Sequence, residues 1–258
     1  MTDPSSPLLS AVDSRGIATL VFNRPEKGNS YSQAMLAALF DEIVRLGTDA
    51  SVRAVVLRGT GKHFSAGADV SEPHDPADTE RVRILALCAA LDTMPKPVIA
   101  LVQGACIGGA VALISCCDVV IATQTAFFAL PEVRLGFAPG PLIPFFLRSM
   151  SERSLRRYLL TGERFTAAEA LRIGLVHELC EADVADVALK RLIDEVLLAG
   201  PNAAVHAKEL LHNLAGKAIT KELLADLQFE FYQRFETPEA VEGRASFREK
   251  RKPKWVPI

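Results

Sequence analysis

Apolar residues recur along the chain with two spacings, and each spacing predicts a type of element. Apolar and polar residues alternate over Gly16–Phe22, which predicts a strand. From Ser32 to Leu46 the apolar positions fall on one face of a helix, and Ser30 or Ser32 can cap its start. By the same criteria, further strands are predicted at Val52–Leu57, Val98–Val102, Asp118–Ala122, Phe127–Ala129 and Leu175–Leu179, and further helices at Thr79–Met94, Gly109–Cys117, Pro141–Arg148, Ser151–Leu160 and Thr166–Ile173.

The pattern changes after Glu181, where only helical spacing remains. Four consecutive helices are predicted without a strand between them, at Val184–Leu198, Asn202–Leu214, Lys221–Phe235 and Pro238–Phe247. Strands that alternate with helices indicate an α/β fold. We therefore expect an α/β core over residues 1–200 and a helical region over residues 201–258.

Composition and charge narrow the function classes. The 258 residues are 49% apolar and carry a net charge of −2, so we expect no nucleic-acid partner. The uncharged stretch from Lys96 to Asp118 is interrupted by Pro97, Gly104 and Gly108, so we expect no membrane span. The five cysteines form no C-x-x-C pair, which favours reduced thiols, a cytoplasmic protein and no metal site.

Two glycine-containing stretches offer backbone N–H groups to a ligand. In His63–Asp69, Gly67 permits unusual dihedral angles, and the small residues let the Ala68 N–H face a cleft. Gln103–Ala110 joins a strand to a predicted helix, so the Gly109 N–H is placed to donate to an anion. The glycine spacing is that of a P-loop, but Ala110 and the next residue replace the required Lys and Ser/Thr, which excludes a nucleotidase.

Glu132 is the candidate acid/base residue. Its neighbours in Leu130–Gly136 are mostly apolar, and burial in a cleft would raise its pKa toward the value that proton transfer near neutral pH requires. The alternative is that Glu132 pairs with Arg134 or caps a turn.

These stretches occur in an order that resembles a known family. The residues that carry the resemblance are Asn23-Arg24-Pro25, Ser65–Asp69, Gln103-Gly104 with Gly108-Gly109, Cys117-Asp118, and Pro131-Glu132 with Leu135-Gly136. Together they resemble the crotonase superfamily, which is the enoyl-CoA hydratase/isomerase family, over nearly the whole chain.

The resemblance implies a fold, a substrate and an assembly. The fold would be a crotonase-type α/β spiral of ββα units with a C-terminal helical region for trimer formation, in a homotrimer or a dimer of trimers. The substrate would be an acyl-CoA thioester, with no cofactor besides the coenzyme A of the substrate. Glu132 would be the acid/base, and the Ala68 and Gly109 N–H groups the oxyanion hole. Further coenzyme A contacts would come from Lys27, Ala66, Gly67, Asp69, Val70, Gly108 and Pro131, and from Phe247 or Lys250 of a neighbouring subunit.

The sequence departs from the pattern at Ala112. Two-carboxylate hydratases of this family carry a second glutamate at the matching position. Three functions are compatible with the missing glutamate. Glu132 could carry out hydration, alone or with Glu72 or Asp75, or it could isomerise an enoyl-CoA as the sole acid/base. The protein could also bind acyl-CoA without efficient turnover. The segment from Phe127 to Gly162 resembles the bacterial branch assigned to methylglutaconyl-CoA or carboxygeranoyl-CoA hydration, which favours a hydratase.

A different enzyme class shares part of one motif. His63–Gly67 nearly matches the G-x-S-x-G elbow of serine hydrolases, with Ser65 as the nucleophile. However, His63 replaces the first glycine, and the motif runs into a polar loop instead of an apolar helix. We therefore expect Ser65 to be a small loop residue.

Overall fold

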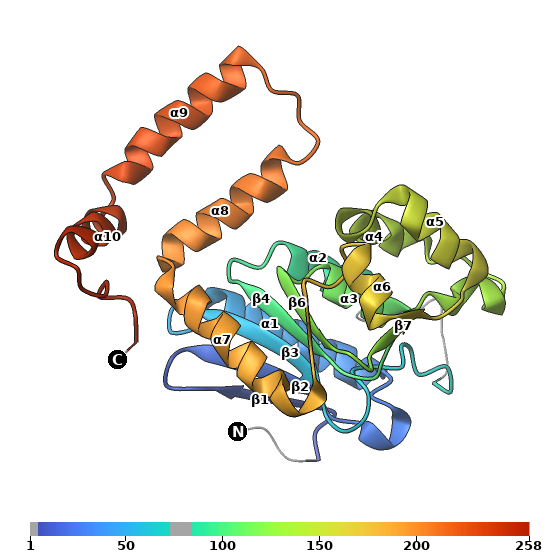
Figure 1. The fold of residues 1–258 in the computed structure, drawn as a ribbon. Helices are drawn as coiled ribbons and strands as arrows, with labels where there is room; N and C mark the ends of the chain where they lie inside the picture. Colours follow the sequence, from blue (N-terminus) through green and yellow to red (C-terminus); the bar gives the residue numbers. More distant parts are fainter. Residues whose placement is uncertain (1–4, 73–83, 258) are drawn as a thin grey trace. The chain divides into compact units, whose positions relative to one another are not determined.

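The computed structural model describes residues 5–72 and 84–257. The chain forms two compact units, which divide between Arg191 and Leu192. The described strands all belong to the first unit, and Figure 1 labels most of them.

The main sheet of the first unit has six strands in the order β1-β2-β3-β4-β6-β9. The strands are β1 (Leu8–Val12), β2 (Ile17–Phe22), β3 (Ala54–Gly59), β4 (Val98–Val102), β6 (Val119–Thr123) and β9 (Glu178–Cys180). β1 is antiparallel to β2, and every other neighbouring pair is parallel. All five residues of β4 are buried, as expected for a parallel strand covered on both faces.

A second sheet of three strands has the order β5-β7-β8. β5 (Ala105–Ile107) follows β4 along the chain, β7 (Phe127–Ala129) follows β6, and β8 (Phe165–Thr166) pairs antiparallel with β7. The chain therefore passes from the main sheet to the small sheet twice. After each passage it enters a helix: α3 after β5, and a short 3₁₀ helix after β7. This alternation places the end of β5 and the end of β7 side by side.

Helices α1 (Gln33–Thr48), α2 (Ile84–Asp92) and α3 (Gly109–Ser115) pack in series, α1 on α2 and α2 on α3. The Ser32 hydroxyl accepts a hydrogen bond from the Met35 N–H at 3.2 Å and caps α1. The remaining helices of this unit are α4 (Ile143–Ser149), α5 (Glu152–Thr161), α6 (Ala167–Arg172) and the start of α7 (Ala185–Leu198).

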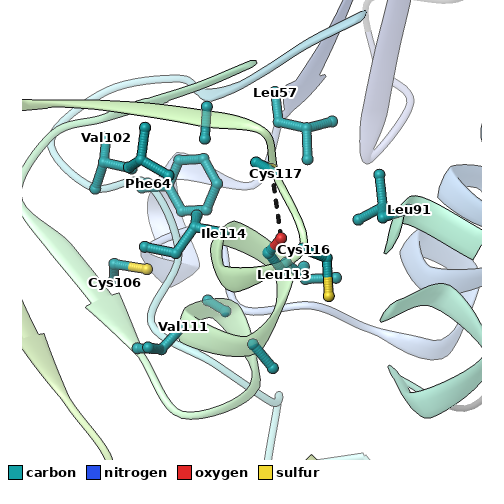
Figure 2. Packing of buried hydrophobic residues seen from close by; sticks show 14 of the residues in the cluster. Leu57, Phe64, Leu91, Val102, Cys106, Val111, Leu113, Ile114, Cys116 and Cys117 are labelled. Carbon is teal, nitrogen blue, oxygen red and sulfur yellow. Dashed lines mark hydrogen bonds between the residues drawn. The ribbon is translucent and has the colours of Figure 1, made fainter. Parts of the chain in front are cut away.

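The core of the first unit lies around α3, as Figure 2 shows. Phe64 packs there among aliphatic side chains of β3, β4 and α3. The Cys117 thiol donates to the Leu113 carbonyl at 3.4 Å (Figure 2). All five cysteines are free thiols and all are buried, so they serve as packing residues in this fold.

The second unit contains α8 (Pro201–Leu214), α9 (Lys221–Phe235) and α10 (Pro238–Arg248), which are drawn in orange to red in Figure 1. The Glu239 carboxylate accepts hydrogen bonds from the Asn202 and Ala203 N–H groups at 3.1 and 2.8 Å and so caps α8 from α10. Several aromatic side chains of α9 are exposed, including Phe229 at 67% and Tyr232 at 60%.

Most predicted elements lie within a few residues of the observed ones, but the sequence pattern does not predict the strands β1, β5 and β8, and one predicted strand is displaced. The predicted strand at Leu175–Leu179 begins only at Glu178, because the backbone of Leu175 and Val176 hydrogen-bonds back to Ala170. The turn predicted before α3 contains the strand β5. The chain between 73 and 83, which holds Asp75 and the start of the helix predicted at Thr79–Met94, lies outside the described residues.

Candidate active site

The two glycine-containing stretches lie side by side as neighbouring extended strands. Ser65 forms a parallel bridge with Cys106: the Ser65 N–H donates to the Ala105 carbonyl at 3.0 Å, and the Ile107 N–H donates to the Ser65 carbonyl at 3.1 Å. Beyond this bridge, the chain from Ser65 turns toward Tyr31 instead of continuing the ladder. The two stretches therefore separate where the predicted donors begin.

Backbone hydrogen bonds to Tyr31 fix the direction in which the Ala68 N–H points. The Tyr31 N–H donates to the Gly67 carbonyl at 2.9 Å, and the Asp69 N–H donates to the Tyr31 carbonyl at 3.1 Å. In such a parallel bridge, the N–H of the central residue, here Ala68, points away from the partner strand. Within the part of the chain that the structure describes, neither the Ala68 nor the Gly109 N–H has a hydrogen-bond acceptor.

Glycine is required at one position in each donor stretch, directly before the donor itself, because the backbone there has a positive φ and leaves no room for a side chain. Gly67 has a φ of +93°, and a Cβ there would lie 2.9 Å from the Ile107 carbonyl oxygen. Gly108 has a φ of +60°, and a Cβ there would lie 2.9 Å from Oε1 of Glu132. The Glu132 carboxylate therefore lies against the bare face of Gly108, directly before the second predicted donor.

The fold positions Glu132 through the small sheet. The Gly108 N–H donates to the carbonyl of Ala129, the last residue of β7, at 2.9 Å. A short 3₁₀ helix, Pro131–Leu135, then begins two residues later and carries Glu132 in its first turn. The motif around Gly108 and the motif around Glu132 are thus joined by one backbone hydrogen bond.

Glu132 has the environment of a proton-transfer group. It is 9% exposed, and its Oε2 atom is buried without a hydrogen-bond partner among the described residues. Burial raises the pKa of Glu132 because the charged form loses its hydration. No ion pair joins it to Arg134 in the described chain; the Arg134 Nε donates instead to the Thr161 carbonyl at 2.9 Å. The structural alternative of an ion pair with Arg134 is therefore wrong.

Sequence reasoning missed Tyr31, whose hydroxyl lies at the same place. A Cβ built on Gly109 would be 2.3 Å from the Tyr31 Oη atom. Burial, and to a smaller extent the charge of Glu132, raises the pKa of the Tyr31 hydroxyl. The available signal was an aromatic hydroxyl in the turn between Asn23-Arg24-Pro25 and the first long helix.

Charged side chains hold the loop that follows Ala68. Asp69 accepts hydrogen bonds from Arg24 at 2.9 Å and from Lys27 at 3.2 Å. The Ser71 hydroxyl, and after it the Arg24 guanidinium, hold the pKa of Asp69 well below its usual range. Lys27, predicted to contact coenzyme A phosphates, is thus paired with Asp69, although its side chain remains 49% exposed.

The other predicted coenzyme A residues fall into two groups. Ala66 and Val70 are exposed on the loop beside Ala68, and Pro131 is half-buried beside Glu132. Phe247 and Lys250 belong to the second unit, where Phe247 is 86% exposed at the end of α10. Their part in coenzyme A binding stays a prediction.

The two candidates for a second carboxylate are Glu72 and Asp75. Among the described residues, no polar contact joins Glu72 to Glu132. Ala112 is fully buried in α3 and supplies no polar atom. The Glu72 carboxylate accepts a hydrogen bond from the Gln33 N–H at 2.8 Å, at the start of α1. Asp75 lies outside the described residues.

The serine hydrolase alternative has no support in the geometry. Ser65 is fully buried, and its hydroxyl donates to the Asn29 carbonyl at 2.8 Å and accepts from the Gly67 N–H at 3.2 Å. The nearby His63 uses Nδ1 to accept a hydrogen bond from the Ala105 N–H at 3.0 Å. Both side chains therefore hold loops together, as expected for Ser65.

Neither a metal-binding cluster nor a membrane-spanning helix is found in residues 5–72 and 84–257. Within these ranges, no group of three or more His, Cys, Asp or Glu side chains is arranged to hold a metal ion. None of the helices found there combines the length and the apolar character of a membrane span.

Comparison with known proteins identifies relatives over nearly the full length. The 2,3-dehydroadipyl-CoA hydratase of Escherichia coli is 32% identical over 240 residues, which cover 92% of this chain and 94% of the relative. An enoyl-CoA hydratase of Shewanella pealeana has a crystal structure similar to this one, with a TM-score of 0.90, 34% identity and 96% of each chain covered. An enoyl-CoA hydratase/isomerase of Marinobacter aquaeolei gives a TM-score of 0.88 at 31% identity, covering 97% of this chain and 99% of its own.

These similarities confirm the predicted crotonase-type α/β fold. The model of the enoyl-CoA hydratase/isomerase family matches residues 13–257, which include both donor stretches and Glu132. The chain is thus an enzyme of the enoyl-CoA hydratase/isomerase family.

Proposed function

We propose that the enzyme adds water across the C2=C3 bond of a 2-enoyl-CoA thioester. One observation carries this proposal. Within residues 5–72 and 84–257, the backbone N–H groups of Ala68 and Gly109 have no acceptor, and the buried Glu132 carboxylate, whose Oε2 has no partner there, lies against Gly108, directly before the second of them. Two donors and one base are what the formation of a thioester enolate requires.

The chemistry follows from these three groups. The thioester carbonyl oxygen accepts hydrogen bonds from the Ala68 and Gly109 N–H groups. Glu132 takes one proton from a water molecule as the water oxygen bonds to C3, and the electrons of the double bond move through C2 to the carbonyl oxygen. The enolate then collapses, and C2 takes the proton from Glu132. Loss of one oxyanion-hole donor typically costs roughly 10²–10³ in rate.

The comparisons support hydration over the alternatives. The relatives from Escherichia coli and Shewanella pealeana are both named as hydratases. Isomerisation by Glu132 alone uses the same donors and base, but it is not favoured by these names. A protein that only binds acyl-CoA does not need a buried carboxylate with a raised pKa, so the environment of Glu132 favours catalysis over binding without turnover.

Coenzyme A is the part of the substrate through which the enzyme binds it, and the proposed reaction uses no further cofactor. The exposed loop residues Ala66 to Val70, with Gly108 and Pro131, are the proposed contacts on the first unit. Lys27 is a proposed phosphate contact because half of its side chain stays exposed beside Asp69. Phe247 or Lys250 of a neighbouring subunit is proposed to contact the coenzyme A phosphates or adenine.

The assembly, the acyl group and the location are part of the same proposal. Apolar side chains are exposed along the second unit, among them Leu211, Phe229 and Phe247, which supports a homotrimer or a dimer of trimers through this region. The acyl group is proposed to be that of the methylglutaconyl-CoA or carboxygeranoyl-CoA branch. Five reduced, buried cysteines favour the cytoplasm.

The test uses 2-enoyl-CoA and 3-enoyl-CoA substrates incubated with the enzyme in H₂¹⁸O and analysed by mass spectrometry. Hydration gives a 3-hydroxyacyl-CoA that carries ¹⁸O, and Glu132→Gln should abolish most of it while coenzyme A binding persists. Interconversion of the two enoyl isomers without ¹⁸O would establish an isomerase instead. Normal turnover by the Gln variant would refute the role of Glu132.

A further inference from the structure

Tyr31 reaches both donor stretches of the proposed active site. Its backbone pairs with the residues on either side of Ala68, as the bonds to Gly67 and Asp69 show. Its ring extends to the other stretch, where a Cβ on Gly109 would lie 2.3 Å from Oη and 3.2 Å from Cζ. The hydroxyl therefore touches the bare α-carbon of the residue that supplies the second N–H.

The Tyr31 hydroxyl has no hydrogen-bond partner among residues 5–72 and 84–257. The side chain is half-buried, and its Oη atom is not fully enclosed by protein atoms. A polar atom that is still accessible can bind water or a ligand, whereas a fully buried one without a partner costs about 1–3 kcal/mol. The hydroxyl is therefore available to a water molecule or a substrate atom.

The nearest chemistry is the Glu132 carboxylate. Its Oε1 lies against the face of Gly108, and the Tyr31 Oη lies against the face of Gly109, the next residue. The Glu132 charge contributes to the raised pKa of the tyrosine, which indicates that the two groups are electrostatic neighbours. No hydrogen bond joins the two groups directly among the described residues, although they lie against consecutive glycines.

We propose that the Tyr31 hydroxyl holds the attacking water together with Glu132, in place of the second carboxylate that Ala112 does not supply. This inference rests on the proposed hydration. Glu132 accepts the water proton that is removed as the oxygen bonds to C3. The phenol oxygen accepts a hydrogen bond from the second hydrogen of the same water, which remains on the product as the hydroxyl hydrogen.

No net proton passes through Tyr31 in this arrangement. A phenol can accept one hydrogen bond while it keeps its own proton. Burial raises the pKa of this hydroxyl above its usual value, so it stays protonated at neutral pH and cannot act as the base. Glu132 remains the only group that exchanges a proton with the substrate.

A second role for the same hydroxyl would be to donate to the enolate oxygen. The two roles differ in a reaction that needs no water attack: exchange of the α-protons of a saturated acyl-CoA with solvent. That exchange uses Glu132 and the oxyanion hole alone. A water-holding group affects hydration only, whereas an oxyanion donor affects both reactions.

The test compares wild type, Tyr31→Phe and Glu132→Gln in two assays. Hydration of but-2-enoyl-CoA and hex-2-enoyl-CoA is followed in H₂¹⁸O, and α-proton exchange of butanoyl-CoA is followed in D₂O. For Tyr31→Phe we expect the kcat of hydration to fall about 10- to 100-fold, as the loss of one hydrogen bond to the reacting water implies. We expect KM and the exchange rate to stay within about twofold, and Glu132→Gln to lose both activities.

Each outcome has a distinct meaning. Equal losses in hydration and exchange for Tyr31→Phe would overturn the water-holding role, and so would full hydration activity. Because both rates come from one preparation, their ratio does not depend on the fraction of folded protein. If the wild type incorporates no ¹⁸O, the proposed function and this inference both fail; if it hydrates and Tyr31→Phe hydrates equally well, only this inference fails.

Discussion

The contact between Gly109 and Tyr31 gives a prediction that can be worked out from distances. In Gly109→Ala, the new methyl carbon would lie 2.3 Å from the Tyr31 Oη, 3.2 Å from Cζ and 3.3 Å from Cγ1 of Ile84. The backbone of Gly109, the first residue of α3, does not have a positive φ, so alanine meets no conformational strain there. Most of the penalty therefore comes from the Tyr31 hydroxyl.

The size of the penalty depends on whether the hydroxyl is present. Non-bonded heavy atoms rest about 3.5–4.0 Å apart, so a contact of 2.3 Å must be relieved by moving the ring, and such overpacking costs about 1–3 kcal/mol. In the Tyr31→Phe background the nearest atoms are at 3.2 and 3.3 Å, which requires a shift of only a few tenths of an ångström. Since alanine is also favoured over glycine in a helix by about 1 kcal/mol, Gly109→Ala should then be neutral or stabilising.

The assay is a double-mutant cycle in equilibrium denaturation, with wild type, both single variants and the double variant. We expect a coupling of about 1–3 kcal/mol, or roughly 2–4 °C in Tm for each kcal/mol in a chain of this size. Gly108→Ala is the matched control: its φ of +60° and its contact with Glu132 do not involve Tyr31, so Tyr31→Phe should not rescue it. Additivity of Gly109→Ala and Tyr31→Phe within about 0.5 kcal/mol would refute the contact.

Two further predictions concern buried polar groups near the site. Burial raises the pKa of Glu132, so its charge opposes folding above the folded pKa, and this penalty disappears as pH falls to the ordinary glutamate range of roughly 4. Glu132→Gln should therefore raise the urea midpoint at pH 8 and raise it less at pH 4; equal gains at both pH values would contradict this. Asn29 is fully buried with a φ of +56°, accepts from the Arg24 N–H and donates to the carbonyls of Thr60 and His63. Asn29→Ala should lower the free energy of unfolding by about 2–4 kcal/mol because three hydrogen bonds are lost, and a loss in denaturation below about 1 kcal/mol would speak against these bonds.

The elements that the sequence predicts well are those long enough to show a period. β2, β4 and α1 repeat their apolar positions over a full strand or several turns, and Ser32 supplies the cap that the sequence suggests. Three strands are missed. β5 and β8 have three and two residues, which is too short for alternation to be recognised, and the five residues of β1 do not alternate between apolar and polar positions. Yet β5 places Cys106 beside Ser65 and so aligns the two donor stretches, which means that the least predictable strand positions the site.

The same distinction applies to the chemistry of the site. The Ala68 and Gly109 donors could be predicted because each depends on small residues adjacent in sequence, and Glu132 because its neighbours are apolar. The missing carboxylate at Ala112 could be recognised only through the resemblance to two-carboxylate hydratases of the family, which carry a glutamate at the matching position. What takes the place of that carboxylate depends on contacts between distant parts of the chain, where the Tyr31 ring meets Gly109 and the Glu132 carboxylate meets Gly108. A glycine in sequence indicates only that a side chain is excluded; the fold reveals which group excludes it, and here the two excluding groups are the proposed base and the proposed holder of its water.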